Sequence, residues 1–130
     1  MFEPADLGPV LDALGERGWV NLQPEVADIE EADRPGSFGI FSSRGPVVPF
    51  ATWHRGERSA GIQHGTGPKV ARRIDVPEGW RVMQDHPKRG LVVRVPPGVP
   101  DDEVLRWLLA TGEQLCPAPL LGRWVAEVHT

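Results

Sequence analysis

Residues 80–116 read WRVMQDHPKRGLVVRVPPGVPDDEVLRWLLATGEQLC, and this stretch decides the fold class. Two short runs, Trp80–Asp85 and Leu91–Val95, flank the loop His86–Gly90, an arrangement typical of a β-hairpin. A Pro-Pro-Gly break follows, and Pro100 begins a helix whose first turn carries three acidic residues. Proline and acids are favoured there, because proline needs no N–H partner and acids meet the positive end of the helix dipole.

The helix predicted after Pro100 has one apolar face at helical spacing. A helix of this kind covers a sheet or another helix. The hairpin and the helix together therefore predict a two-layer α+β domain with a mainly antiparallel sheet. The apolar face is formed by Val104, Leu105, Leu108, Leu109 and Leu115.

The remaining elements extend this sheet. A short helix is expected near Gly8, a second one over Lys69–Ile74, and a last strand after Gly122. The element order is α-β-β-β-β-α-β-β-α-β in a single domain of residues 1–130, with an acidic loop at 25–37. The other strands are expected at Trp19–Gln23, Phe38–Ser42, Val47–His54 and Ser59–His64.

The histidines show no metal-binding pattern. If Arg55-Gly56-Glu57 closes a hairpin, His54 lies opposite Arg58 and His64 lies opposite Val48. Both histidines would then share one sheet face but stand about 20 Å apart, at about 3.4 Å per residue. No H-x-x-x-H spacing is present, so neither a metal nor another cofactor is expected.

The charge is unevenly distributed along the chain. The net charge is −4, from 14 Lys+Arg and 18 Asp+Glu, but residues 1–33 carry −8, residues 34–94 carry +7 and residues 95–130 carry −3. Such asymmetry indicates either an anion-binding surface on the middle segment or an acidic flank that covers a basic sheet within the fold. The acidic total argues against nucleic acid as the partner.

The cysteine count and the lengths of the apolar runs bear on where the protein is expected to reside. One cysteine excludes an intrachain disulfide, and no apolar run approaches the roughly 20 residues of a membrane-spanning helix. The acidic, proline-broken start argues against a signal peptide. We therefore expect a cytoplasmic protein with no membrane contact.

In element order the chain resembles the YbjN-like and type III secretion-chaperone-like small α+β domains, which run α-β3-α-β2-α. The stretch Trp80–Cys116, with its hairpin, break and amphipathic helix, carries the resemblance. The extra strands at Trp19 and Trp124 depart from that order. The resemblance implies a protein-binding role without catalysis, often as a dimer.

A candidate ligand site follows the strand predicted at Ser59–His64, where a strand-to-helix turn could present backbone N–H groups to an anion. The alternative is an ordinary turn in which Thr66 caps the helix. The residues concerned are His64, Gly65, Thr66, Gly67, Lys69, Arg72 and Arg73.

The five tryptophans fall one to an element, which is typical of a shared core. Two places remain candidates for an exposed interface, because tryptophan beside arginine often forms a binding hot spot. These candidates are Trp53, His54, Arg55 and Trp107.

The sequence therefore favours a non-catalytic, cytoplasmic protein-interaction or chaperone-like module, which binds a protein partner or a second copy of itself as a homodimer. The alternative is a small anionic-ligand-binding protein or an enzyme centred on Gly65–Lys69. Convergence of Trp53, His64, Lys69 and His86 on one pocket would favour that alternative.

Overall fold

A computed structural model describes residues 2–3, 6–26, 48–116 and 120–129 of the chain. Six strands form one sheet in the order β4-β5-β3-β2-β1-β6, and each neighbouring pair is antiparallel. The predicted α+β class is confirmed. The elements are α1 (Gly8–Ala13), β1 (Trp19–Val26), β2 (Phe50–His54), β3 (Ser59–Gln63), the 3-10 turn η2 (Val70–Arg72), β4 (Arg81–His86), β5 (Gly90–Arg94), α3 (Asp101–Leu115) and β6 (Leu120–His129).

Some predictions fall outside the described residues. These are the strand at Phe38–Ser42, the start of the strand at Val47, and most of the acidic loop at 25–37. In the described part, the helix predicted after Pro100 is confirmed as α3, and the hairpin before it is confirmed as β4 and β5.

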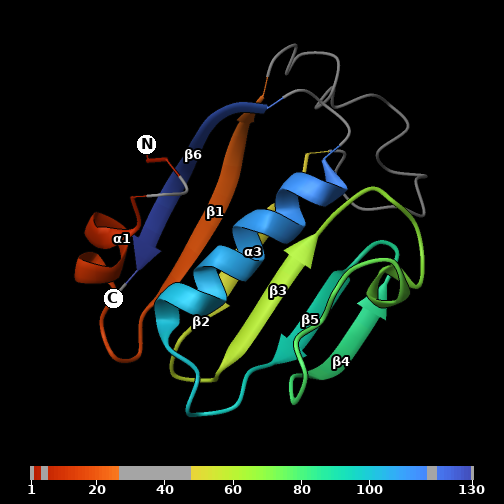
Figure 1. Cartoon of the computed structure of the whole chain (residues 1–130), viewed down its shortest axis with the longest axis horizontal. Helices are drawn as coiled ribbons and strands as arrows, with labels where there is room; N and C mark the ends of the chain where they lie inside the picture. The colour runs from red at the N-terminus through yellow and green to blue at the C-terminus, as the bar shows by residue number, and fades with distance from the viewer. Residues whose placement is uncertain (1, 4–5, 27–47, 117–119, 130) are drawn as a thin grey trace.

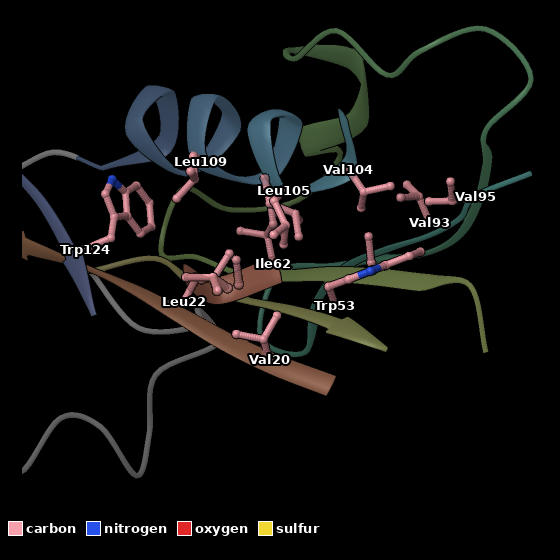
Figure 2. Packing of buried hydrophobic residues seen from close by; sticks show 14 of the residues in the cluster. Val20, Leu22, Trp53, Ile62, Val93, Val95, Val104, Leu105, Leu109 and Trp124 are labelled. Atoms are coloured by element: carbon pink, nitrogen blue, oxygen red, sulfur yellow. The ribbon is translucent and has the colours of Figure 1, made fainter. Parts of the chain in front are cut away.

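Helix α3 lies across one face of the sheet, as Figure 1 shows. Its predicted apolar face is buried, because alternate residues of β1, β2, β3 and β5 point toward it (Figure 2). The strand register aligns Val20, Trp53, Ala60 and Val93 in one row across this core face. Side chains alternate along a strand, so the residues between them point to the opposite face.

A buried junction holds the N-terminus of α3 to the sheet. The Trp53 indole Nε1–H donates to Asp101 Oδ1 (3.0 Å), and Arg55 Nε donates to Asp101 Oδ2 (2.8 Å). Trp53 is fully buried, and the Asp101 side chain is only 15% exposed. One carboxylate therefore joins the first turn of the helix to the end of β2.

A close contact fixes the other end of α3. Gly112 faces the indole ring of Trp124 on β6, and a Cβ at position 112 would stand 2.7 Å from Trp124 Cη2. Both residues are buried. The helix approaches the sheet this closely because position 112 has no side chain.

The turn between β2 and β3 differs from the prediction by one residue. It spans the four residues Arg55–Arg58, so His54 pairs with Ser59 and not with Arg58. Arg58 adopts a left-handed conformation (φ 53°), and its guanidinium donates to the carbonyls of Pro96 (2.6 Å) and Val99 (2.7 Å). A shift of one residue moves a strand's side chains to the other face.

Two other element predictions were wrong in extent. The helix expected over Lys69–Ile74 is only the three-residue turn η2, and the strand expected from Val47 begins at Phe50. Proline has no N–H for a strand ladder, which agrees with Pro49 preceding β2. The last strand begins at Leu120, before the predicted Gly122.

We expect Gly112→Ala to destabilise the fold by about 1 kcal/mol in urea unfolding. Alanine gains about 1 kcal/mol of helix propensity, but the added methyl group overpacks a rigid ring at a cost of about 1–3 kcal/mol. In a Trp124→Phe background the smaller ring makes room, so the same change should become neutral or stabilising. Stabilisation of the wild-type protein by Gly112→Ala would contradict the close contact.

Asp101→Ala should cost about 1–3 kcal/mol of unfolding free energy, because it leaves the buried Trp53 N–H without its acceptor. Asp102→Ala is the matched control. Asp102 lies in the same helical turn, but its pair with Arg106 is exposed at the surface. Such pairs contribute roughly 0–1 kcal/mol. Equal losses in the two variants would show that the Trp53 junction contributes nothing.

Candidate functional site

The predicted ligand turn is built around a buried histidine. His64 is fully buried at the end of β3, on the core side of the sheet. Its Nδ1 accepts the Thr66 backbone N–H (3.2 Å) and lies 2.8 Å from Thr66 Oγ1. The one-residue shift of the β2–β3 turn places His64 and His54 on opposite faces, which corrects the expectation that they share one face.

The backbone donors of this turn already have an anionic partner. Asp85 of β4 accepts the N–H groups of Val70 (3.1 Å) and Ala71 (3.0 Å) with its two carboxylate oxygens. Arg73 Nη2 folds back to the carbonyl (3.1 Å) and hydroxyl (3.1 Å) oxygens of Thr66. Of the residues expected to hold an external anion, His64, Thr66 and Arg73 are thus engaged with the chain itself, whereas Lys69 and Arg72 are exposed.

Charging His64 is unfavourable in this setting. Burial lowers the pKa of His64 below its ordinary value of 6.5, and the positive charge of Arg73 lowers it further, while Asp85 acts in the opposite direction. Protonation at Nδ1 would also remove the acceptor of the Thr66 N–H. The folded state therefore favours the neutral imidazole.

The other residues of the predicted turn differ in their exposure. Lys69 and Arg72 are exposed, Gly65 is half-buried, and Gly67 is buried with a φ of 94°. His86, in another hairpin, accepts the N–H groups of its own turn. The convergence of Trp53, His64, Lys69 and His86 that an enzyme would need is not found.

The four residues predicted as interface candidates differ in burial and in their contacts. Trp53, a candidate for an exposed interface, is fully buried and lies in the core row between Val20 and Ala60. Arg55 is committed to Asp101. Trp107 Nε1 donates to the Asp75 carbonyl (2.8 Å), and its ring meets Trp80 edge to face. His54 alone lies on the sheet face opposite α3.

This opposite face is the second candidate site, and we call it the uncovered face, because neither described helix packs against it. The register defines it as two rows of residues across the six strands. One row is His129, Trp19, His54, Ser59, Arg94 and Arg81, and the other is Glu127, Asn21, Thr52, Gly61, Val92 and Gln84.

An aromatic stack crosses three strands of this face. The Trp19 ring lies between His129 (centroids 3.8 Å apart) and His54 (5.4 Å), and both pairs are nearly parallel. His129 Nε2 is also 2.9 Å from Glu127 Oε1. The next row continues with a hydrogen bond from Thr52 Oγ1 to Asn21 Oδ1 (2.7 Å). Direct cross-strand pairs of this kind make the face rigid.

Two hollows lie beside the stack. One, of about 210 Å³, is lined by His54, Thr52, Gly61 and Arg89 among others, and the second, of about 340 Å³, includes Met83 and Arg94. Both hollows are also lined by Ser59 and Val92, so they adjoin along β3 and β5. This face was not predicted from the sequence, although the alternation of Trp19, Asn21 and Gln23 along β1 is the pattern that could have indicated it.

Comparison with known proteins gives no relative from which to infer a function, so the function is inferred from the geometry. No protein-family model, curated protein or solved structure matches the chain. Among residues 2–3, 6–26, 48–116 and 120–129, no three His, Cys, Asp or Glu side chains come together as a metal site. None of the helices described there is long and apolar enough to cross a membrane.

The stability of the protein should fall as the pH is lowered below about 6.5. In that range an unfolded His64 binds a proton and the folded one does not, so protons favour unfolding until the lower, folded pKa is passed. His64→Asn keeps an acceptor for Thr66 but cannot titrate, so its stability should fall less between pH 7 and pH 5. Urea unfolding at several pH values measures the difference. A His64→Asn variant that loses stability as steeply as the wild-type protein over this range would contradict the assignment.

Proposed function

We propose that this chain is a non-catalytic protein-interaction module that binds a protein partner through the uncovered face. The observation that carries the proposal is the one-sided core. Helix α3 covers one face of the sheet, while the other presents a half-buried tryptophan together with methionine, valine and arginine side chains. Tryptophan, methionine and arginine are enriched at interfaces and at their energetic hot spots.

The state of the histidines supports a binding role over a catalytic one. His64 Nδ1 accepts a hydrogen bond within its own turn, and its Nε2, which has no partner among the described residues, is buried away from solvent. His129 is stacked on Trp19 beside Glu127. A general base needs a free nitrogen within reach of a substrate. The resemblance to chaperone-like α+β domains agrees with this proposal, which includes a cytoplasmic location.

The rigidity of the face also supports binding. Trp19 is fixed by two neighbouring rings and Thr52 by Asn21, so little side-chain freedom is lost when a partner docks. The two adjoining hollows provide concave surface next to these fixed side chains. A preformed, partly apolar surface binds a protein at a lower entropic cost than a mobile one.

Site-specific photo-cross-linking tests the proposal. A photoreactive amino acid at position 52 points from the middle of the uncovered face, and one at position 106 points from the exposed side of α3. We expect position 52, but not position 106, to cross-link a defined protein or a second copy of the chain in cells, identified by mass spectrometry. Equal cross-linking at the two positions, or none at position 52, would contradict the proposed binding face.

A further inference from the structure

Three arginines gather on one half of the uncovered face. Arg81 and Arg94 pair across β4 and β5, in the same row as Ser59. Arg89 lines the smaller hollow together with Thr52 and other residues of the same face. All three side chains are exposed.

Within the described part of the chain, none of these three arginines forms an ion pair, and none donates a side-chain hydrogen bond. Arg55 binds Asp101, while Arg58 and Arg73 donate to oxygens of the chain. The ion pairs in the described part of the chain are formed by Arg55, Arg106, Arg123 and His129. None of them involves Arg81, Arg89 or Arg94. The acids on this face are Glu57 beside Arg94 and Glu127 beside His129, with Glu25 held by Arg123.

The hollows place these charges along a trough. Arg89 lies on the rim of the smaller hollow and Arg94 on the rim of the larger, and the two hollows share Ser59 and Val92. The two arginines are five residues apart, or about 17 Å along an extended chain. Gly61 lines the smaller hollow, and because it has no side chain the hollow is deeper at this position.

We infer that the uncovered face binds an extended acidic polypeptide, whose carboxylates pair with Arg81, Arg89 and Arg94. The inference rests on the proposed function and names the chemistry of the partner. Guanidinium groups recognise carboxylates by paired hydrogen bonds, and an extended chain places every second side chain on the same side. Its alternate residues would meet Val92 and Met83 in the trough.

Charge and stacking favour a polypeptide over two other occupants. A second copy would oppose three arginines with few acids, because Glu25 and Glu127 already have partners. A nucleic acid would need aromatic faces for its bases, but both faces of the Trp19 ring are covered by histidines. The net charge of −4 also repels a phosphate backbone.

Fluorescence anisotropy with a labelled decapeptide of alternating Glu and Val tests the inference, and a decapeptide of alternating Lys and Val is the matched probe. We expect binding of the acidic peptide only. Arg81→Gln/Arg94→Gln should weaken it by about tenfold, since charge pairs at an interface supply part of its affinity. Lys69→Gln/Arg72→Gln removes the same charge from η2, on the core side of the sheet, and should change the affinity less than about twofold.

Several results would overturn the inference. These are equal binding of the two peptides, equal effects of the two double variants, and tighter binding of decathymidylate than of the acidic peptide. A dimer in sedimentation velocity that Arg81→Gln/Arg94→Gln abolishes would assign the face to a second copy instead. If the cross-link at position 52 persists in that double variant, the proposed binding face is supported and the inference of an acidic partner is contradicted. If position 52 captures nothing, the proposed function itself fails.

Discussion

The carboxylate of Asp101 is the interaction on which the arrangement of the two layers depends. It accepts hydrogen bonds from Trp53 and Arg55, at the end of β2, and so fixes where α3 begins relative to the sheet. The contact of Gly112 with Trp124 then sets how closely the far end of the helix lies. With both ends held on one face, this helix buries the core residues of four strands and contributes nothing to the opposite face. The uncovered face is thus a consequence of how α3 is anchored.

Elements whose signals are local could be predicted from the sequence. Helix α3 and the β4–β5 hairpin were found because apolar spacing, first-turn acids and turn residues all lie within the segment that folds. The β2–β3 register could not be found in this way. Its turn includes Arg58 in a left-handed conformation, stabilised by the distant carbonyls of Pro96 and Val99. One extra turn residue was enough to place His64 and His54 on opposite faces of the sheet instead of on the same face.

The candidate sites show the same division between local and distant causes. Residues 64–73 have the local features of an anion-binding turn. The anion that the N–H groups of Val70 and Ala71 meet, however, is Asp85 of β4, which lies 15 and 14 positions further along the chain. The same sequence pattern is compatible with a turn that binds an external anion and with one whose N–H groups bind a carboxylate of the protein itself. The uncovered face needs still more information, since its rows combine six strands that are not in sequence order. Trp19 was correctly placed in a strand, yet its histidine neighbours come from β2 and β6.

The charge of a segment likewise does not describe a surface until each side chain is placed. The basic middle of the chain carries +7, but part of that charge is used inside the fold, where Arg55 binds Asp101 and Arg58 binds carbonyls beside the Trp53 ring. Arginine suits both uses, because its planar guanidinium can satisfy several acceptors when buried or recognise a carboxylate when exposed. Arg89 and Arg94, by contrast, are exposed and line the two hollows of the uncovered face, and Arg81 pairs with Arg94 across β4 and β5.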